Sequence, residues 1–167
     1  QTMIDWHGLR DSWEALRCES NELFIRVLAD ELAPLPGLFP LLDALEAAGI
    51  PRAIATSSDR ELLDACLAPF DLRHRFEFAL TSEDVTRGKP HPEVYLQAAA
   101  RFGVSPSQTV VFEDSQNGCR AAHAAGAFTI AVPGPHSRTH DFSGASLVVT
   151  SLADPALYAA LNLRSIS

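Results

Sequence analysis

Apolar residues in the first 33 positions recur at a spacing of three or four, with no alternating pattern between them. The residues at this spacing are Leu9, Trp13, Leu16, Leu23, Val27 and Leu28. Positions three or four apart lie on one face of a helix, so this part of the chain is predicted to form one or two helices. The segment Ala33–Gly37 contains two prolines and ends in glycine, which stops a helix and marks a boundary.

Beyond this boundary, short apolar runs alternate with helical stretches. The runs of strand length cover residues 52–56, 76–80, 109–112, 127–132 and 147–150. The helical stretches cover residues 38–48, 62–67, 92–102 and 116–125. Strands that alternate with helices predict right-handed βαβ units, and the apolar run Thr109–Phe112 is typical of a strand buried on both faces. We therefore expect an α/β fold, with a Rossmann-like parallel sheet as the middle of three layers.

Composition narrows the class of partner. The 167 residues include 13 Lys and Arg against 21 Asp and Glu, a net charge of −8. An acidic chain is a poor general binder of nucleic acid, which requires a basic surface, but a few local cations suffice for a small phosphorylated molecule. The three cysteines are far apart, and no apolar run approaches the roughly 20 residues that span a bilayer. We expect no disulfide framework, no membrane contact and a cytoplasmic location.

Polar residues follow three of the predicted strands directly. Thr56, Ser57 and Ser58 follow the first, the loop after the second contains Lys89, and Glu113 and Asp114 follow the third. Ligands bind at the carboxyl ends of parallel strands, so these side chains are expected at one edge of the sheet. Hydroxyls, an ammonium and paired carboxylates suit a phosphate group with a divalent cation.

Each of these features also has a purely structural interpretation. Ser58 and Glu61 match a capping box, so the hydroxyls could serve only to begin a helix. Lys89 could be a solvated surface lysine, although Gly88 and Pro90 restrict its backbone. Asp114 could cap the following helix while Glu113 stays in solvent. Against this, two adjacent carboxylates after an apolar strand repel each other and are costly to desolvate, and Mg²⁺ relieves both effects.

Three segments in this order resemble the motifs of the haloacid dehalogenase-like hydrolases, in the branch of phosphoglycolate phosphatases and β-phosphoglucomutases. They are Ile54–Ser58, Gly88–Glu93 and Val111–Gly118. The resemblance implies that Thr56, with Ser57 beside it, binds the transferring phosphoryl group. It implies that Lys89 stabilises an aspartyl-phosphate intermediate, and that Glu113 and Asp114 hold Mg²⁺. Residues 1–33 look like part of the α-helical cap of this branch, and residues 34–167 like its α/β core.

The sequence departs from this family in one respect. The DxDG motif, whose first aspartate is the nucleophile on the central strand, is absent, and Asp5–Gly8 does not match it. We expect the nucleophile to lie outside this chain and its strand to be missing from the sheet. A parallel sheet that lacks its central strand loses two hydrogen-bond ladders and several buried side chains, each worth about 1.5–3 kcal/mol. Either a missing segment or a partner strand is expected to fill the position; otherwise a monomer is expected.

Three functions remain open. The first is a Mg²⁺-dependent phosphatase of a small phosphorylated metabolite, acting through an aspartyl-phosphate. The second is a sugar-phosphate mutase, which would share these residues. Mutase-like members carry a cap lysine 38 residues before the motif hydroxyl, where this chain has Cys18 beside Arg17, and this difference favours the phosphatase. The third is a catalytically inactive binding protein that has lost its nucleophile.

Overall fold

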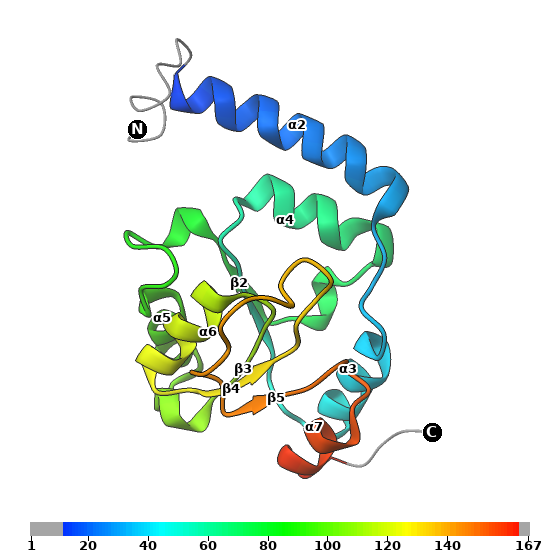
Figure 1. Cartoon of the computed structure of the whole chain (residues 1–167), viewed down its shortest axis with the longest axis vertical. Helices are drawn as coiled ribbons and strands as arrows, with labels where there is room; N and C mark the ends of the chain where they lie inside the picture. Colours follow the sequence, from blue (N-terminus) through cyan, green and yellow to red (C-terminus); the bar gives the residue numbers. More distant parts are fainter. Residues whose placement is uncertain (1–11, 164–167) are drawn as a thin grey trace.

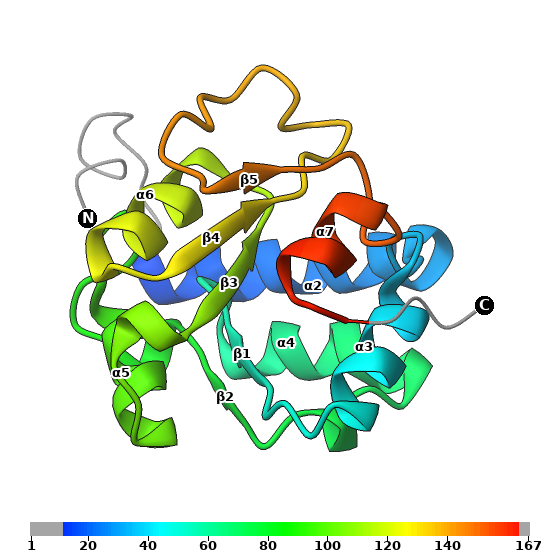
Figure 2. The same cartoon turned by 90° about the horizontal axis from the view of Figure 1, so that it is seen from below.

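Five short strands, each parallel to its neighbours, form the middle of the fold (Figures 1 and 2). The structure is a computed structural model that describes residues 12–163. The strands are β1 (Ala53–Ala55), β2 (Phe78–Leu80), β3 (Val110–Glu113), β4 (Phe128–Ala131) and β5 (Leu147–Val148). Each lies within a predicted run except β3, which extends one residue beyond its run to Glu113, and the parallel α/β class is confirmed.

Helices connect the first four strands as the alternating pattern predicts: α4 (Arg60–Leu67), α5 (Glu93–Phe102) and α6 (Gln116–Ala125). Before β1 lie α2 (Trp13–Glu31) and α3 (Leu38–Ala47), and after β5 lies α7 (Pro155–Ala160). Short 3₁₀ turns cover Ala68–Phe70, Arg73–Arg75, Ser82–Asp84 and Pro106–Gln108. The sequence pattern did not predict α7, because six residues are too few for a helical period to stand out; Asp154 caps it and Pro155 is its first residue.

Two apolar clusters place helices on both faces of the strands. On one face, Val94 and Tyr95 of α5 and Ala121 of α6 pack against Phe78 and Leu80 of β2. The other cluster joins residues of α3 and α7 to β4 and to the segment after β5. Its buried members are Leu41, Ala44, Leu45, Ile130, Val132, Val149, Leu152, Leu157 and Tyr158. The expected three layers are therefore present.

The five described strands form two sheets, separated at the place where the sequence analysis expects a central strand to be missing. One sheet has the order β1–β2 and the other the order β3–β4–β5. In Figure 2, β1 lies on the side of β3 that faces away from β4. Lys89 Nζ joins the ends of the two sheets, since it donates to the Ala55 carbonyl of β1 at 3.0 Å and to Glu113 of β3 at 2.5 Å. Among the described strands, none lies between β1 and β3 to pair with both.

Exposure along β3 reflects this interruption. Val110 is 40% exposed, and Val111 and Phe112 are only partly buried. The prediction that Thr109–Phe112 is buried on both faces is therefore wrong in this part of the strand. The physical reason is that β3 has a ladder on the β4 side alone, within residues 12–163.

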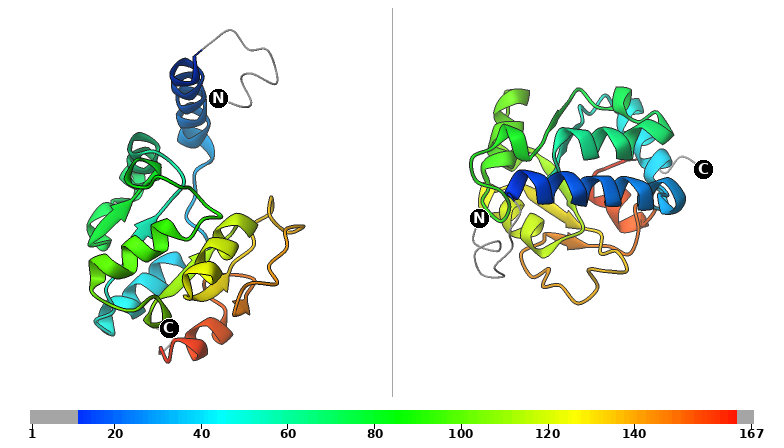
Figure 3. Two further views of the ribbon diagram at one scale, coloured as in Figure 1. Left: turned by 90° about the vertical axis from the view of Figure 1, so that its left-hand side faces the viewer. Right: turned by 90° about the horizontal axis from the view of Figure 1, so that it is seen from above.

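The helix α2 lies beside α4, outside the three layers (Figures 1 and 3). Its helical prediction is confirmed for the residues that the structure describes, whereas Leu9 and Asp5–Gly8 lie outside them. Leu23, Phe24 and Val27 of α2 are about half exposed, at 54%, 49% and 55%. The segment from Leu32 to Gly37 connects α2 to α3, at the predicted boundary. In the part of the chain that the structure describes, no helix combines the length and the apolar character needed to cross a membrane.

Gly37, at the start of α3, makes a close approach that only glycine permits. Its φ is +89°, and a Cβ there would lie 2.4 Å from the Ala153 nitrogen in the segment before α7. Gly49, after the same helix, has a φ of +66° with nothing within 4 Å of the corresponding point. Alanine substitutions at Gly37 and Gly49 therefore distinguish the free-energy cost of a left-handed backbone from the additional cost of a steric clash with Ala153.

Gly49→Ala is expected to lower the free energy of unfolding by about 1–2 kcal/mol, the cost of placing a Cβ on a left-handed backbone. Gly37→Ala is expected to cost about 1–3 kcal/mol more, because α3 must move away from the α7 segment. Urea unfolding of the two variants measures the difference. Equal losses would contradict the close packing of α3 at Ala153.

Candidate active site

The three hydroxyl residues after β1 form a loop that ends before α4. The N-cap of α4 is Asp59, whose carboxylate Oδ1 accepts from the Leu62 amide at 3.1 Å. The predicted capping box of Ser58 and Glu61 is therefore wrong: the helix begins one residue later, where a carboxylate is a stronger acceptor for the amide than a hydroxyl. Thr56 Oγ1 accepts from the Ser58 amide at 3.1 Å, which leaves the hydroxyl proton of Thr56 to donate to a ligand.

Lys89 is held between the ends of β1 and β3. Its side chain is only 11% exposed, and its ammonium donates to the Ala55 carbonyl and to Glu113 Oε1. The ring of Tyr95 lies beneath the ammonium, with 5.0 Å from Nζ to the ring centroid. The interpretation of Lys89 as a solvated surface lysine is therefore wrong.

Glu113 and Asp114 have different surroundings. Glu113 is buried, and its carboxylate accepts from Lys89, from the Tyr95 hydroxyl and from Ser115 Oγ, the last at 3.1 Å. Asp114 is exposed and lines the cavity described below. The alternative in which Asp114 caps α6 and Glu113 is solvated is wrong, because Ser115 is the N-cap and accepts from the Gly118 amide at 3.0 Å.

Two groups around Glu113 stay protonated at neutral pH. Burial raises the pKa of the Tyr95 hydroxyl far above its ordinary value, and the charge of Glu113 raises it further. Burial also raises the pKa of the Cys119 thiol to about 11, with smaller contributions from Glu113 and Asp114. Tyr95 is therefore a hydrogen-bond donor, and Cys119 is a neutral thiol buried in α6.

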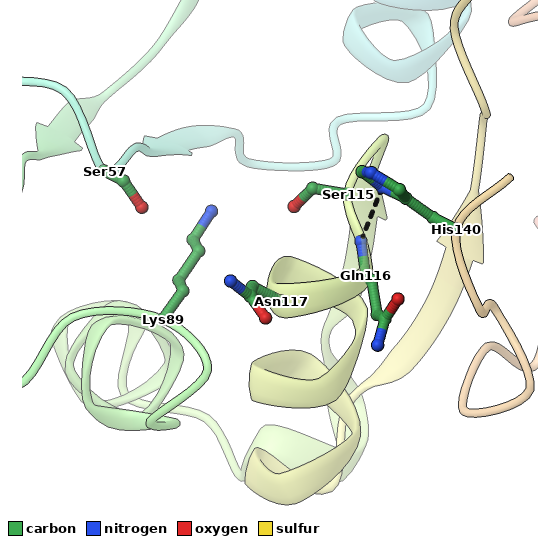
Figure 4. Close-up of a pocket in the computed structure, with 6 residues that line it drawn as sticks. All are labelled: Ser57, Lys89, Ser115, Gln116, Asn117 and His140. Atoms are coloured by element: carbon green, nitrogen blue, oxygen red, sulfur yellow. Dashed lines mark hydrogen bonds between the residues drawn. The ribbon is translucent and has the colours of Figure 1, made fainter. Parts of the chain in front are cut away.

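Two adjacent cavities bring the predicted residues together. A cavity of about 430 Å³ is lined by Ala55, Thr56, Ser57, Ser58, Lys89, Phe112, Glu113, Asp114 and Ser115. A second, of about 380 Å³, is lined by Ser57, Lys89, Ser115, Gln116, Asn117 and His140. Ser57, Lys89, Ser115 and Asn117 point toward a shared space (Figure 4). All five predicted residues, Thr56, Ser57, Lys89, Glu113 and Asp114, therefore line one site.

Some lining residues were not found from the sequence. Ser115, Gln116 and Asn117 directly follow Glu113 and Asp114, so their position at the start of α6 was the available signal. His140 comes from the loop between β4 and β5, and its Nδ1 accepts from the Gln116 amide at 3.4 Å. No sequence pattern connects it to the site. His91, two residues after Lys89, accepts from the Glu93 amide at 3.3 Å and lines neither cavity.

The carboxylates of Glu113 and Asp114 suit a hard cation whose remaining ligands come from phosphate and water. Within residues 12–163, no three His, Cys, Asp or Glu side chains gather closely enough to hold a metal by themselves. Mg²⁺ needs only one or two protein carboxylates when phosphate oxygens and water complete its shell. The exposed carboxylate of Asp114 offers the more accessible ligand, since three donors already occupy Glu113.

Asp59 links the hydroxyl loop to α2. Its Oδ2 accepts from Arg17 at 2.8 Å and from Asn21 at 2.7 Å, and its side chain is 7% exposed. Burial raises the pKa of the Asp59 carboxyl, but hydrogen bonds from Asn21, the Leu62 amide and Arg17 outweigh it and lower the pKa overall. Arg17 is thus paired with a core residue rather than directed at the cavity.

Comparison with known proteins agrees with the α/β fold and identifies the family. The family model of the haloacid dehalogenase-like hydrolases matches residues 4–126. A protein named "Probable pseudouridine-5'-phosphatase" from Drosophila melanogaster is 35% identical over 162 residues, covering 91% of this chain and 68% of the relative. Fructose-1-phosphate phosphatase YqaB of Escherichia coli is 39% identical over 114 residues, covering 67% and 58%.

A solved structure gives the same result for the fold. CbbY from Rhodobacter sphaeroides in complex with phosphate has a TM-score of 0.77 and 33% identity, covering 86% of this chain and 65% of that one. The chain therefore belongs to the haloacid dehalogenase-like hydrolases. It spans between 40% and 68% of the length of the curated relatives compared with it.

The hydrogen bonds that the Asp59 carboxylate accepts from Arg17 and Asn21 of α2 are expected to weaken in acid. Because the pKa of Asp59 is lowered on folding, its stabilising contribution is complete above the ordinary value of 3.8 and is lost as the pH falls through the lowered value. Asp59→Asn keeps an acceptor for the helix cap but removes the charge. We expect wild type to be more stable than Asp59→Asn at neutral pH, and the difference to shrink as the pH falls below that ordinary value.

Urea unfolding across this pH range measures that difference. Asp64→Asn is the matched control, since Asp64 is an exposed carboxylate on the same helix, and its effect is expected to be small at every pH. A difference for Asp59→Asn that stays constant with pH would show that its charge does not hold α2.

Gly118 leaves the space that the Glu113 carboxylate occupies. A Cβ at Gly118 would lie 1.9 Å from Glu113 Cδ. Helix propensity alone predicts that Gly118→Ala in α6 would stabilise the protein by roughly 0.5–1 kcal/mol. We expect the opposite sign, a loss of about 1–3 kcal/mol, because the carboxylate must leave its buried position.

Denaturant unfolding of Gly118→Ala tests this sign. Gly134→Ala is the control, because nothing lies within 4 Å of the Cβ that it would add. If Gly118→Ala proved more stable than wild type, the close contact with Glu113 would be refuted.

Proposed function

We propose that this chain carries most of the core and part of the cap of a Mg²⁺-dependent phosphatase acting on a small phosphorylated metabolite, such as a sugar phosphate. The observation that carries the proposal is the convergence of Thr56, Ser57, Lys89 and Asp114 on one polar cavity at the carboxyl ends of β1 and β3. Hydroxyl donors and a cation bind phosphoryl oxygens, and an open carboxylate beside them suits a divalent metal. Two relatives are named for phosphatase activity on phosphorylated sugars or nucleosides.

The interruption of the sheet supports a specific place for the nucleophile. A strand between β1 and β3 would pair with both sheets, and its carboxyl end would meet Lys89, which joins their ends. We infer that an aspartate on such a strand, outside the described residues, attacks phosphorus, and that water then hydrolyses the aspartyl-phosphate. With this strand in place, the protein needs no partner chain to complete its sheet.

The residues of this chain would bind and orient the phosphoryl group. Thr56 donates its hydroxyl proton to one phosphoryl oxygen, since Oγ1 already accepts from the Ser58 amide. Ser57 is exposed at the cavity and supplies a second hydroxyl. The Lys89 ammonium neutralises charge on the oxygens as the phosphoryl group transfers, a reaction that depends mainly on positioning and electrostatics.

Asp114 would be the direct ligand of Mg²⁺, with Glu113 beside it. When bound, Mg²⁺ supplies charge stabilisation to the phosphoryl oxygens and to the attacking carboxylate. In this chain, Asp114 provides the exposed carboxylate, and the buried Glu113 keeps Lys89 in place.

The surroundings of Arg17 favour a phosphatase over a sugar-phosphate mutase. A mutase must bind a second anionic group of its substrate, and a cap cation is one way to do so. In α2, Arg17 is committed to Asp59, and the neighbouring Cys18 is not a basic side chain. A monophosphate with an uncharged leaving group is therefore the better fit.

The test is Mg²⁺-dependent turnover of p-nitrophenyl phosphate by the full-length protein and its Asp114→Asn variant. Losing the open carboxylate is expected to lower kcat/KM by about 100-fold or more, with partial recovery at high Mg²⁺, because metal-held charge stabilisation supplies several kcal/mol to the transition state. Asp64→Asn, the same change at an exposed site on α4, is expected to keep wild-type turnover.

Unchanged turnover in Asp114→Asn would refute the metal assignment. A full-length protein that binds phosphate but turns over none of a panel of phosphate esters would favour the inactive binding protein. Isomerisation of β-glucose 1-phosphate with a catalytic bisphosphate would favour the mutase.

A further inference from the structure

Tyr95 contacts both members of the buried ion pair at the site, yet the proposed reaction assigns it no role. It lies on α5, is 6% exposed, and donates its hydroxyl to Glu113 Oε1, the same oxygen that accepts from Lys89. Its ring lies under the Lys89 ammonium, 5.0 Å from Nζ to the centroid. One side chain therefore fixes the carboxylate through a hydrogen bond and the ammonium through a cation–π contact.

The remaining sides of Glu113 are closed by α6. Ser115 Oγ donates to Oε2 at 3.1 Å, and Gly118 lies against the carboxylate where any Cβ would overlap it. The three donors, Lys89, Tyr95 and Ser115, together with the backbone of Gly118, hold the Glu113 carboxylate in an orientation directed at Lys89. Asp114, the next residue, has no comparable enclosure and is exposed.

Removing the Tyr95 hydroxyl would leave a buried carboxylate with one acceptor position unfilled. An unsatisfied charged acceptor is costly, so Glu113 would rotate or admit water to regain a donor. Either change alters the position of the Lys89 ammonium, because Glu113 and the Ala55 carbonyl are its two hydrogen-bond acceptors among the described residues. The effect would fall on Lys89 and not on Asp114.

We propose that Tyr95 is a positioning residue that holds Glu113 toward Lys89, so that Lys89 meets the transferring phosphoryl group while Asp114 is left to the metal. This inference rests on the proposed phosphatase function. It assigns the two carboxylates different tasks: Glu113 orients the lysine, and Asp114 binds the cation.

The experiment compares the full-length protein with its Tyr95→Phe variant. We expect kcat on p-nitrophenyl phosphate to fall roughly tenfold, the scale of one hydrogen bond to a charged group, while KM changes by less than about threefold. Affinity for orthovanadate, which mimics the transferring phosphoryl group and is measured by calorimetry, is expected to fall by about the same factor as kcat. Affinity for Mg²⁺, titrated separately, is expected to stay within about twofold, since Asp114 is unaffected.

Two further variants separate positioning from core packing. Tyr158→Phe removes a hydroxyl from a tyrosine equally buried, at 6% exposure, in the cluster of α3 and α7, and is expected to leave kcat and vanadate affinity unchanged. In a Glu113→Gln background, Tyr95→Phe is expected to change kcat by less than about twofold, because residues acting through one network are not additive.

Wild-type kcat and vanadate affinity in Tyr95→Phe would overturn the proposal, as would a full tenfold effect in the Glu113→Gln background. A large loss of Mg²⁺ affinity would also overturn it, since Tyr95 would then support the metal site. If the wild-type protein turns over no phosphate ester, the proposed function fails. Direct vanadate binding by wild type and Tyr95→Phe would then still decide whether Tyr95 positions Lys89, and a wild type that binds no vanadate would refute both.

Discussion

The ion pair between Lys89 and Glu113 is the interaction on which the site depends. It joins the loop before α5 to the end of β3, and the same ammonium reaches the last carbonyl of β1. Both side chains are largely buried, so breaking the pair by removing one partner would cost about 3–5 kcal/mol. The carboxylate can stay buried because Tyr95 and Ser115 donate hydrogen bonds to it and Gly118 leaves room for it. A lysine held in this way presents its charge at a fixed point, which a flexible surface lysine cannot do.

The location of the site could be predicted from the sequence because strand ends are easy to recognise. A short apolar run followed by polar residues places those residues at the carboxyl edge of a parallel sheet. Thr56, Lys89 and Asp114 converge there as expected, and α6 ends at Gly126, as the sequence predicts. The different surroundings of Glu113 and Asp114 could not be predicted, because adjacent carboxylates are equivalent in the sequence until another element of the fold encloses one of them. That element is α5, and no local spacing links Tyr95 to Glu113. The same limit applies to Asp59 as the cap of α4 and to α7.

The interruption of the sheet and the site occupy the same place. The edges of β1 and β3 that face each other have no strand partner in the described part of the chain, and the residues at their carboxyl ends line the cavity. Backbone groups at the edge of a sheet favour pairing with another strand. A strand placed between β1 and β3 would form a hydrogen-bond ladder with each of them, and its last residue would lie beside Lys89. The stability of the core and the assembly of the catalytic residues would then depend on the same segment.

The contact of α2 with Asp59 connects this helix directly to the loop of Thr56, Ser57 and Ser58. Asp59 stands one residue beyond Ser58, begins α4, and accepts from Arg17 and Asn21 of α2. A shift of α2 would therefore change the hydrogen bonds of the residue that ends the loop of Thr56, Ser57 and Ser58. Such a contact need not be strong to matter, because phosphoryl transfer depends on the placement of a few donors. In the proposed phosphatase, a cap that contains α2 would thus influence the reaction through the position of the hydroxyls as well as through the closure of the site.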